Sequence, residues 1–463
     1  MDFLIVFGAL LFLMFVAYRG YSVILFAPLA AMAAVFLLNP SAVPVMFTAV
    51  FMEKMVVFIK LYFPVFLLGA IFGKVIELSG FSDSIVATMI RLCGRKHVLL
   101  SIVLVCAILT YGGVSLFVVV FAVYPFAAGM FRQAGIPKRL IPGTIALGAF
   151  TFTMDSLPGS PQIQNIIPTT FFKTDSWAAP WLGLVGGLFV FLSGFLYLQW
   201  RCRQAVSRNE GYGDHHSNEP EAYIHKKIPH PALAVLPLLV VGVANKGLTG
   251  IVNSRFGAVA HLSLPGLDHE LEISVPTVAA IWSIEGALLL GILTVLVLAY
   301  QPVIQKFAAA SRTAVSGALL AAVNTASEYG FGAVIAALPG FLVIREALKV
   351  IPNPLVNEAI TVTTLSGITG SASGGMSIAL AAMPEQFLNA AKLAAISPEV
   401  LHRVAAMASG GMDTLPHNGA VITLFAVTGL THKQSYRDIF AITCLKTVAV
   451  FFVIGVYYLT GLV

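Results

Sequence analysis

The sequence predicts an all-α polytopic membrane protein built as an inverted-topology repeat, with about ten full transmembrane helices, two re-entrant hairpins and two broken helices. Composition is the first reason: of 463 residues, 58% are hydrophobic and 10% are charged, whereas a soluble domain usually carries about 25% charged residues. The second reason is that apolar runs of spanning length follow one another along the chain. The third is that polar breaks interrupt these runs at corresponding positions of two halves.

Several classes of protein are disfavoured by the same sequence. The net charge of +6 does not indicate a nucleic-acid partner, because in a membrane protein the placement of Lys and Arg matters and not their sum. The four cysteines are scattered without metal-type spacing, so we expect no metal and no other cofactor. The sequence has no P-loop, HExxH or G-x-S-x-G motif, which argues against an enzyme. Ser156 beside Asp155 would be a weak case for a membrane hydrolase.

The first half, residues 1–200, combines plain spans with interrupted ones. Plain spans are expected at 2–18, 21–38, about 55–78 and 177–200. The first of these lacks a basic leading region and a small-residue cleavage site, so it is interpreted as a span and not as a signal peptide. Residues 140–172 are expected to form a broken helix, because the string Asp-Ser-Leu-Pro interrupts them.

The stretch near 98–130 is predicted to be a re-entrant hairpin. Residues 110–115, Thr-Tyr-Gly-Gly-Val-Ser, interrupt it. Basic residues flank it on both sides, namely Arg95, Lys96, Arg132, Lys138 and Arg139. A plain span should place its flanks on opposite faces of the membrane, so this pattern favours a segment that enters and leaves on one face.

Residues 201–230 are predicted to be a cytoplasmic linker between the halves. Arg201 to Lys227 is the longest polar stretch and contains five basic residues. Its adjacent histidines, His215 and His216, fit a solvated loop better than a metal site. The distribution of Lys and Arg favours this linker inside the cell and both ends of the chain outside.

The second half, residues 231–463, repeats the order of the first. Plain spans are expected at 230–245, 275–300, about 313–341 and 439–462, with a polar loop at 246–274. A second hairpin is expected near 357–390, because residues 366–377 are rich in Gly and Ser. A broken helix is expected at 399–430, where Gly410 and Gly411 weaken a helix and Pro416 removes a backbone donor.

Three landmarks recur in the same order in both halves. The segment before each hairpin ends in similar strings, at 75–81 and 335–341, and each hairpin has a Gly-rich tip. Asp155 of the first break lies opposite Asp413 of the second, and Ser160 opposite Asn418. One hairpin should open to the inside and the other to the outside. Broken helices in corresponding positions of two halves indicate the binding site of a secondary transporter, near the middle of the bilayer.

Three strings resemble one family of permeases: the pair of Asp-Ser/Thr-Leu-Pro breaks, Thr-Leu-Pro-His-Asn-Gly-Ala at 414–420, and Asn-Thr-Ala-Ser-Glu-Tyr-Gly-Phe-Gly at 324–332. Over essentially its whole length the chain resembles the gluconate permease (GntP) family of the Ion Transporter superfamily, and is most similar to its hydroxybutyrate-permease-like members. The resemblance implies proton-coupled uptake of small hydroxy-carboxylates across a bacterial inner membrane. It also implies a dimerising scaffold domain and a transport domain.

One departure from the family pattern bears on the substrate. The gluconate branch tends to carry an acidic residue at the first hairpin tip, where this chain has Gly112 and Gly113. We therefore expect a substrate with fewer hydroxyl groups, a small hydroxy-monocarboxylate resembling 3-hydroxybutyrate, imported with protons by alternating access. A gluconate or other sugar-acid symporter and a sodium-coupled carboxylate transporter are the alternatives, and an anion channel is a more remote one.

A carboxylate substrate needs hydrogen-bond donors at membrane depth, and hairpin tips and broken helices provide backbone N–H groups and small hydroxyls. The predicted substrate-binding residues are Thr110, Gly112, Gly113, Ser115, Ser156, Ser160, Ser371, Ser373, Gly374, Thr414 and Asn418. The structural alternative for any one of the hydroxyls is helix packing.

Four titratable residues are candidates for coupling to a proton or, less favoured, to Na⁺. They are Asp155, Asp413, His417 and Glu328. Charged groups inside a membrane are costly and usually functional, and His titrates near neutral pH. The alternative for the two aspartates is that each caps the half-helix after its break, because Asp is a preferred N-cap residue.

Overall fold

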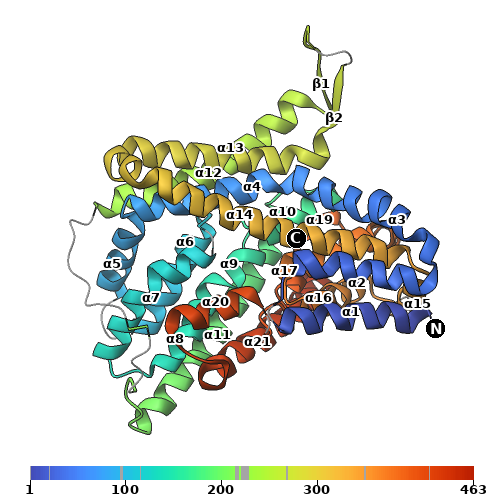
Figure 1. Ribbon diagram of the computed structural model, residues 1–463. Helices are drawn as coiled ribbons and strands as arrows, with labels where there is room; N and C mark the ends of the chain where they lie inside the picture. Colours follow the sequence, from blue (N-terminus) through green and yellow to red (C-terminus); the bar gives the residue numbers. More distant parts are fainter. Residues whose placement is uncertain are drawn as a thin grey trace.

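Helices make up almost the whole molecule (Figure 1). The computed structural model describes residues 2–19, 21–93, 97–114, 116–213, 218–219, 229–266, 270–348, 351–416 and 418–463. The first half contains α1 (Asp2–Tyr18), α2 (Val23–Leu38), η1 (Pro40–Ala42), α3 (Val43–Met46), η2 (Phe47–Met52), α4 (Glu53–Leu78), α5 (Phe81–Cys93), α6 (Val98–Tyr111), α7 (Leu116–Gln133), η4 (Lys138–Leu140), α8 (Ile141–Ala149), α9 (Phe152–Asp155), α10 (Ile163–Phe172) and α11 (Pro180–Ser207).

The second half has the same helical character. It contains α12 (Pro231–Phe256), β1 (Val259–Leu262), β2 (Leu271–Ser274), α13 (Val275–Leu298), α14 (Tyr300–Ala337), α15 (Pro339–Leu348), α16 (Pro354–Thr369), α17 (Ala372–Ala382), α18 (Pro384–Leu393), α19 (Pro398–Ser409), α20 (Gly419–Thr428) and α21 (His432–Thr460). The predicted class, an all-α membrane protein, is confirmed; one two-stranded sheet is the only addition within the described residues.

Six helical stretches of the described chain are long and apolar enough to cross a bilayer. They are Pro40–Leu78, Pro180–Ser207, Pro231–Phe256, Val275–Leu298, Tyr300–Ala337 and His432–Thr460. Other apolar helices, α6 and α17 among them, are shorter than a span. The number of about ten full spans stays a prediction. The same holds for the boundaries of the two halves and the linker, at 1–200, 201–230 and 231–463.

The interruptions lie where the sequence places them. The first hairpin is α6 and α7, which are separated at the Gly112–Gly113 turn. The broken helix at 140–172 is α8, α9 and α10, and the one at 399–430 is α19 and α20. In the second hairpin, α16 ends at Gly370, whose φ of 65° is the left-handed conformation that glycine tolerates.

Two predicted boundaries were wrong. The span expected at about 55–78 is α4, although further helical turns precede it from Pro40, whereas the span expected at 313–341 begins already at Tyr300 in α14. A single charged residue does not end a helix, because a long basic side chain can extend along the helix surface toward water. The loop expected at 246–274 is helical to Phe256 and then forms β1 and β2.

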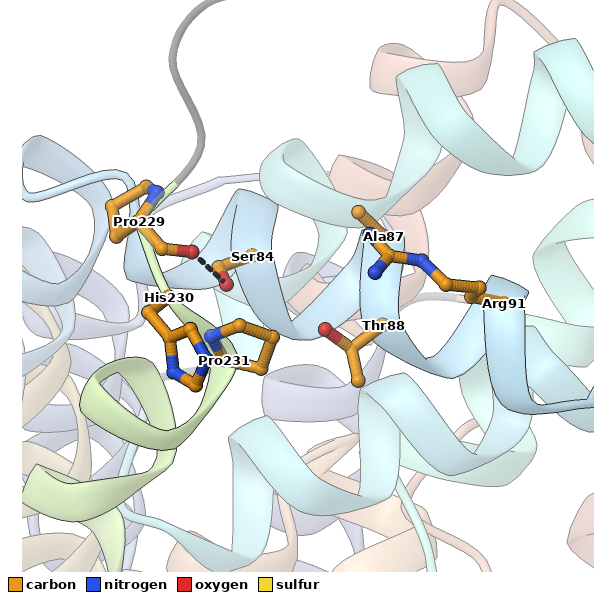
Figure 2. Close-up of a pocket in the computed structure, with 7 residues that line it drawn as sticks. All are labelled: Ser84, Ala87, Thr88, Arg91, Pro229, His230 and Pro231. Atoms are coloured by element: carbon orange, nitrogen blue, oxygen red, sulfur yellow. Dashed lines mark hydrogen bonds between the residues drawn. The ribbon is translucent and has the colours of Figure 1, made fainter.

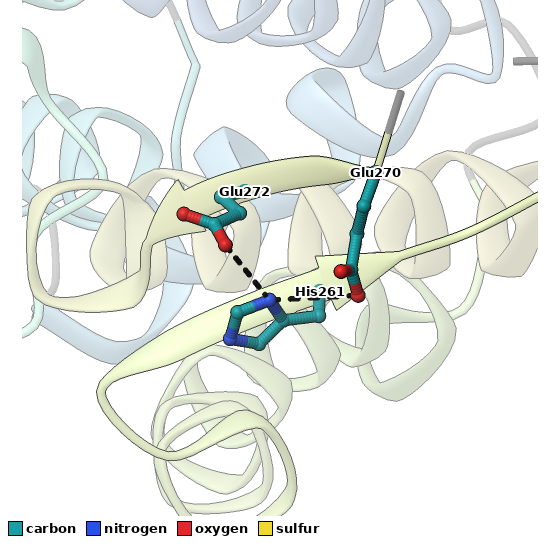
Figure 3. A group of neighbouring side chains, drawn as sticks. All are labelled: His261, Glu270 and Glu272. Atoms are coloured by element: carbon teal, nitrogen blue, oxygen red, sulfur yellow. Dashed lines mark ion pairs between the residues drawn. The ribbon is translucent and has the colours of Figure 1, made fainter. Parts of the chain in front are cut away.

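The two strands form an antiparallel hairpin that projects from the body beyond α12 and α13 (Figure 1). His261 of β1 is paired in register with Glu272 of β2. The imidazole Nδ1 lies 3.4 Å from Glu272 and 3.6 Å from Glu270, and all three side chains are exposed (Figure 3). The strand register accounts for this group as cross-strand pairing on a solvated surface.

The packing of the first half recurs in the second. α1 packs against α2 and against α15, while α12 packs against α13 and against α5. α4 packs against α13, α14 packs against α2, and α4 and α14 pack against each other. Each contact has a counterpart when the halves are exchanged, which is the behaviour expected of an internal repeat whose two copies are intertwined.

Part of the predicted linker is held against both halves by ionic and polar contacts. Glu219 forms ion pairs with Lys138, at 2.8 Å, and with Arg132 at the end of α7. The adjacent Asn218 donates through Nδ2 to the Ala426 carbonyl oxygen of α20 at 2.6 Å. Because Lys138 is fully buried, Glu219 is an important counterion for a charge that has left water.

Replacing Glu219 with glutamine is expected to lower the unfolding free energy by up to about 3 kcal/mol, since it removes a carboxylate from a buried ammonium. Thermal unfolding of the detergent-solubilised protein measures this. Glu210→Gln is the matched control: hydrogen bonds from Arg139 hold the pKa of Glu210 below its usual value, but the pair is more exposed and should contribute less than about 1 kcal/mol. That contribution is present at neutral pH and fades as pH falls through the lowered pKa. Equal effects of the two variants would contradict this prediction.

Candidate substrate and coupling site

Each hairpin packs against the helix that follows the break of the other half. We call α6 with α7 hairpin 1 and α16 with α17 hairpin 2; residues 150–162 are break 1 and residues 410–418 are break 2. α7 packs against α20, which follows break 2, and α17 packs against α10, which follows break 1. The labels of α9, α10, α17 and α19 accordingly fall in the middle of the molecule (Figure 1).

Asn418 joins break 2 to hairpin 2. As the N-cap residue of α20 it accepts hydrogen bonds through Oδ1 from the backbone N–H groups of Ala420 and Val421, at 2.7 and 3.0 Å. Its Nδ2 donates to the Gly370 carbonyl oxygen at the hairpin tip, at 2.8 Å. One side chain thus satisfies the helix start and fixes the distance to the tip.

Gln162 takes the corresponding place in break 1, and not Ser160 as the sequence alignment predicts. Gln162 occupies the N-cap position of α10, and its Nε2 donates to the Thr110 carbonyl oxygen of hairpin 1 at 2.7 Å. Ser160 instead donates to the Thr153 carbonyl oxygen inside the break, at 2.7 Å. Break 1 is two residues longer, which moves the capping position along the chain.

The aspartates of the two breaks share one lysine. Lys446 of α21 donates through Nζ to Asp413 Oδ1 at 2.8 Å and lies 3.9 Å from Asp155 Oδ2. All three side chains are buried. The alternative in which the aspartates cap the following half-helices is wrong, because the N-cap positions belong to Gln162 and Asn418.

A buried arginine fixes the backbone of break 1. Arg403 of α19 donates to the carbonyl oxygens of Ala178 and Asp155, at 2.7 and 3.1 Å, and to Asn165 Oδ1 at 3.0 Å. The neighbouring His402 is also fully buried and contacts Asn165 Oδ1 through Nε2 at 3.2 Å. α19 of the second half therefore supports the break of the first.

Two other predicted hydroxyls are engaged within the breaks. Ser156 donates through Oγ to Asp155 Oδ1 at 2.7 Å. Thr414 Oγ1 pairs with Thr443 Oγ1 of α21 at 2.5 Å. Both side chains are buried and have partners inside the protein, and their role in binding the substrate stays a prediction.

Hairpin 2 presents several of its predicted residues to α14. Ser371 caps α17 by accepting from the Gly374 N–H at 3.0 Å, and Ser373 Oγ lies 3.3 Å from Thr325 Oγ1 of α14. Glu328, one turn beyond Thr325, is buried. A Cβ on Gly374 would lie 1.6 Å from Glu328 Oε2, so only glycine leaves room for the carboxylate against the hairpin backbone.

Buried polar atoms without a hydrogen-bond partner concentrate at hairpin 2. Among the described residues they include Glu328 Oε2 and, on the hairpin itself, Ser366 Oγ, Ser377 Oγ and both carboxylate oxygens of Glu358. Hairpin 1 contributes Thr110 Oγ1. Because roughly 90% of buried polar groups are paired in proteins, this concentration distinguishes hairpin 2 as the polar member of the pair.

The tip of hairpin 1 has apolar surroundings. A Cβ on Gly112 would lie 2.5 Å from Leu238 Cδ2 of α12, and one on Gly113 would lie 3.3 Å from Pro161 and 3.4 Å from Leu288. Gly113 also has a φ of 96°, which disfavours any side chain. Two predicted residues, Ser115 and His417, lie outside the described residues.

Sequence reasoning missed several buried polar residues of this region. They are Lys446, Arg403, His402 and Glu358, together with the half-buried Gln162. A signal was available for the charged ones, because a Lys, Arg or Glu inside an apolar run is costly and marks a functional or structural partner. Which partner each one meets could not be deduced, since the contacts join α19 and α21 to segments far away in the sequence.

A separate surface pocket of about 260 Å³ lies between α5 and the start of α12. Thr88 and Arg91 line it from α5, and Ser84 donates to the Pro229 carbonyl oxygen at 2.7 Å across one side (Figure 2). None of the predicted site residues lines this pocket. The candidate site is therefore defined by the hairpins and breaks and not by this surface pocket.

Comparisons with known proteins agree with this architecture. The profile of the GntP family permeases matches residues 60–251. The uncharacterized transporter YxjC of Bacillus subtilis (strain 168) is 57% identical over 472 residues, covering 100% of each chain. The crystal structure of the Alcanivorax borkumensis YdaH transporter, described as having an unusual topology, matches with a TM-score of 0.50 at 16% identity, over 92% of this chain and 90% of that one, and supports the fold alone. The chain therefore belongs to the GntP permease family and is a multi-pass membrane transporter.

Proposed function

We propose that this permease imports a small hydroxy-monocarboxylate, of the size of 3-hydroxybutyrate, together with protons. It works by alternating access in the bacterial inner membrane, as a homodimer in which a hairpin-bearing domain moves against a dimerising scaffold. The substrate is a small organic anion, and no cofactor takes part.

The observation that supports this proposal best is the position of Glu328 beside the tip of hairpin 2. The start of α17 offers backbone N–H groups and the hydroxyls of Ser371 and Ser373, which suit a carboxylate. An ionised Glu328 next to them would repel that anion in a low-dielectric site. Protonation of Glu328 removes the repulsion, so proton and substrate load together.

The surroundings of the hairpin 1 tip favour a small substrate. Its tip is glycine without an acidic side chain, and it lies against Leu238, Leu288 and Pro161. Such surroundings offer few partners for the hydroxyl groups of a sugar acid, whose burial without hydrogen bonds would be costly. A short acid with one hydroxyl group suits this site better than gluconate.

Uptake into proteoliposomes tests the proposal. Labelled 3-hydroxybutyrate is offered under an inward proton gradient or an inward sodium gradient, with lactate, gluconate or citrate as competitors. We expect proton-driven accumulation that lactate inhibits and gluconate does not. Accumulation of gluconate would replace the substrate assignment by that of a sugar acid, and accumulation driven by sodium alone would contradict proton coupling.

A further inference from the structure

At the two breaks, two carboxylates, those of Asp155 and Asp413, share one ammonium group, that of Lys446. Lys446 Nζ has two close hydrogen bonds, to Asp413 Oδ1 and to the Phe150 carbonyl oxygen, both at 2.8 Å. Asp155 receives a hydrogen bond from Ser156 and is 3.9 Å from the ammonium. Lys446 is thus committed to Asp413, and Asp155 is the less stabilised carboxylate.

Of the other groups that face Asp155, Arg403 is a second buried cation that attracts this carboxylate from nearby, although its own hydrogen bonds go to neutral oxygens of Ala178, Asn165 and the Asp155 main chain. Asp155 therefore has no cation in direct hydrogen-bond contact, whereas Asp413 has Lys446. Tyr111 of α6 donates to the Pro158 carbonyl oxygen at 2.8 Å. His402 is engaged with Asn165 and with Thr174 Oγ1.

The close approach is built into the backbone. A Cβ on Gly410 would lie 2.1 Å from Asp155 Oδ2 and 2.9 Å from Lys446 Nζ. Break 2 therefore has a glycine where the carboxylate of break 1 meets the lysine. The cluster joins one residue of break 1, one of break 2 and one of α21, so any movement of one break relative to the other alters it.

We infer that Lys446 is a tethered counterion which neutralises one of the two break aspartates, so that the cluster binds a single coupling proton, on Asp155. The inference rests on the proposed proton symport and adds the residue that sets the number of protons at the breaks. A buried carboxylate without a cation of its own is neutralised by taking up a proton. Lys446 is a positioning residue here, since it acts through the aspartates.

A charge-balance series tests this inference. Asp155→Asn and Asp413→Asn each leave one carboxylate for one ammonium, so both should lose proton-driven accumulation. Adding Lys446→Met to Asp413→Asn again leaves one carboxylate without a cation, and accumulation should return. The return should be smaller for Asp155→Asn with Lys446→Met, because the remaining carboxylate is then Asp413.

A measurement without substrate separates this inference from the proposed function. Infrared difference spectra recorded during pH titration detect the carbonyl stretch of a protonated buried carboxyl group. The band should weaken in Asp413→Asn, return when Lys446→Met is added, and increase in Lys446→Met alone. Arg201→Met with Asp438→Asn is the matched control, because it removes another buried ion pair, of 2.7 Å, that involves α21; its band should equal that of the unaltered protein.

Either the uptake assay or the infrared titration can overturn the inference. If the double variant Asp413→Asn with Lys446→Met recovers neither accumulation nor the infrared band although it inserts at normal levels, Lys446 does not set the proton count. If no substrate accumulates in the unaltered protein but the band follows the series, the proposed substrate fails and the charge balance stands. If the band is the same in all variants, the breaks do not bind the proton.

Discussion

Replacing Glu328 with glutamine is expected to abolish proton-driven accumulation while leaving the amount of inserted protein near normal. The substitution keeps the shape of a buried side chain that lies against the backbone of Gly374. It removes the only group at the hairpin 2 tip, among the described residues, that can exchange a proton with an arriving carboxylate. Uptake of labelled substrate under an inward proton gradient measures the loss.

The matched control is Glu285→Gln on α13, a half-buried glutamate that lies outside the hairpins and the breaks. It should accumulate substrate like the unaltered protein. Gly374→Ala gives an independent test, because its methyl group would occupy the place of Glu328 Oε2 and displace the carboxylate. Normal accumulation by both Glu328→Gln and Gly374→Ala would contradict the role given to this carboxylate.

Replacing Arg403 with methionine should have the largest effect on stability. The side chain is fully buried and supplies the hydrogen bonds of the Ala178 carbonyl oxygen, at 2.7 and 3.3 Å, and one to the Asp155 carbonyl oxygen at 3.1 Å. Each buried acceptor left without a donor costs about 1–3 kcal/mol. We expect a loss of roughly 3 kcal/mol or more, measured by thermal unfolding of the detergent-solubilised protein.

Two further variants define the cause. Arg403→Lys keeps the charge but lacks the planar fork of donors, so it should recover little of the stability. Arg437→Met removes an exposed basic residue of α21 and should change the unfolding free energy by less than about 0.5 kcal/mol. Full recovery with lysine would show that the charge of Arg403, and not its hydrogen-bond geometry, holds break 1 together.

Local chemistry made the hairpins and breaks predictable. Glycine at 112 and 113, glycine at 410 and 411 and proline at 416 act on the backbone of their own segment, through missing side chains or a missing N–H. The helices duly stop at these places. Boundaries marked only by charged residues, such as Lys306 and Arg312, were misplaced because a charge on a helix surface leaves the backbone hydrogen bonds intact.

The sequence by itself determined the helical membrane class, the family and the segments that hold the polar residues, because periodic apolar runs and backbone-breaking residues act locally. Only the tertiary structure decided which polar groups meet. Lys446 joins Asp155 to Asp413, and Gln162, not Ser160, takes the position equivalent to Asn418. These pairings depend on how intertwined halves pack in three dimensions, and burial forces each charge to find a partner that spacing along the chain does not reveal.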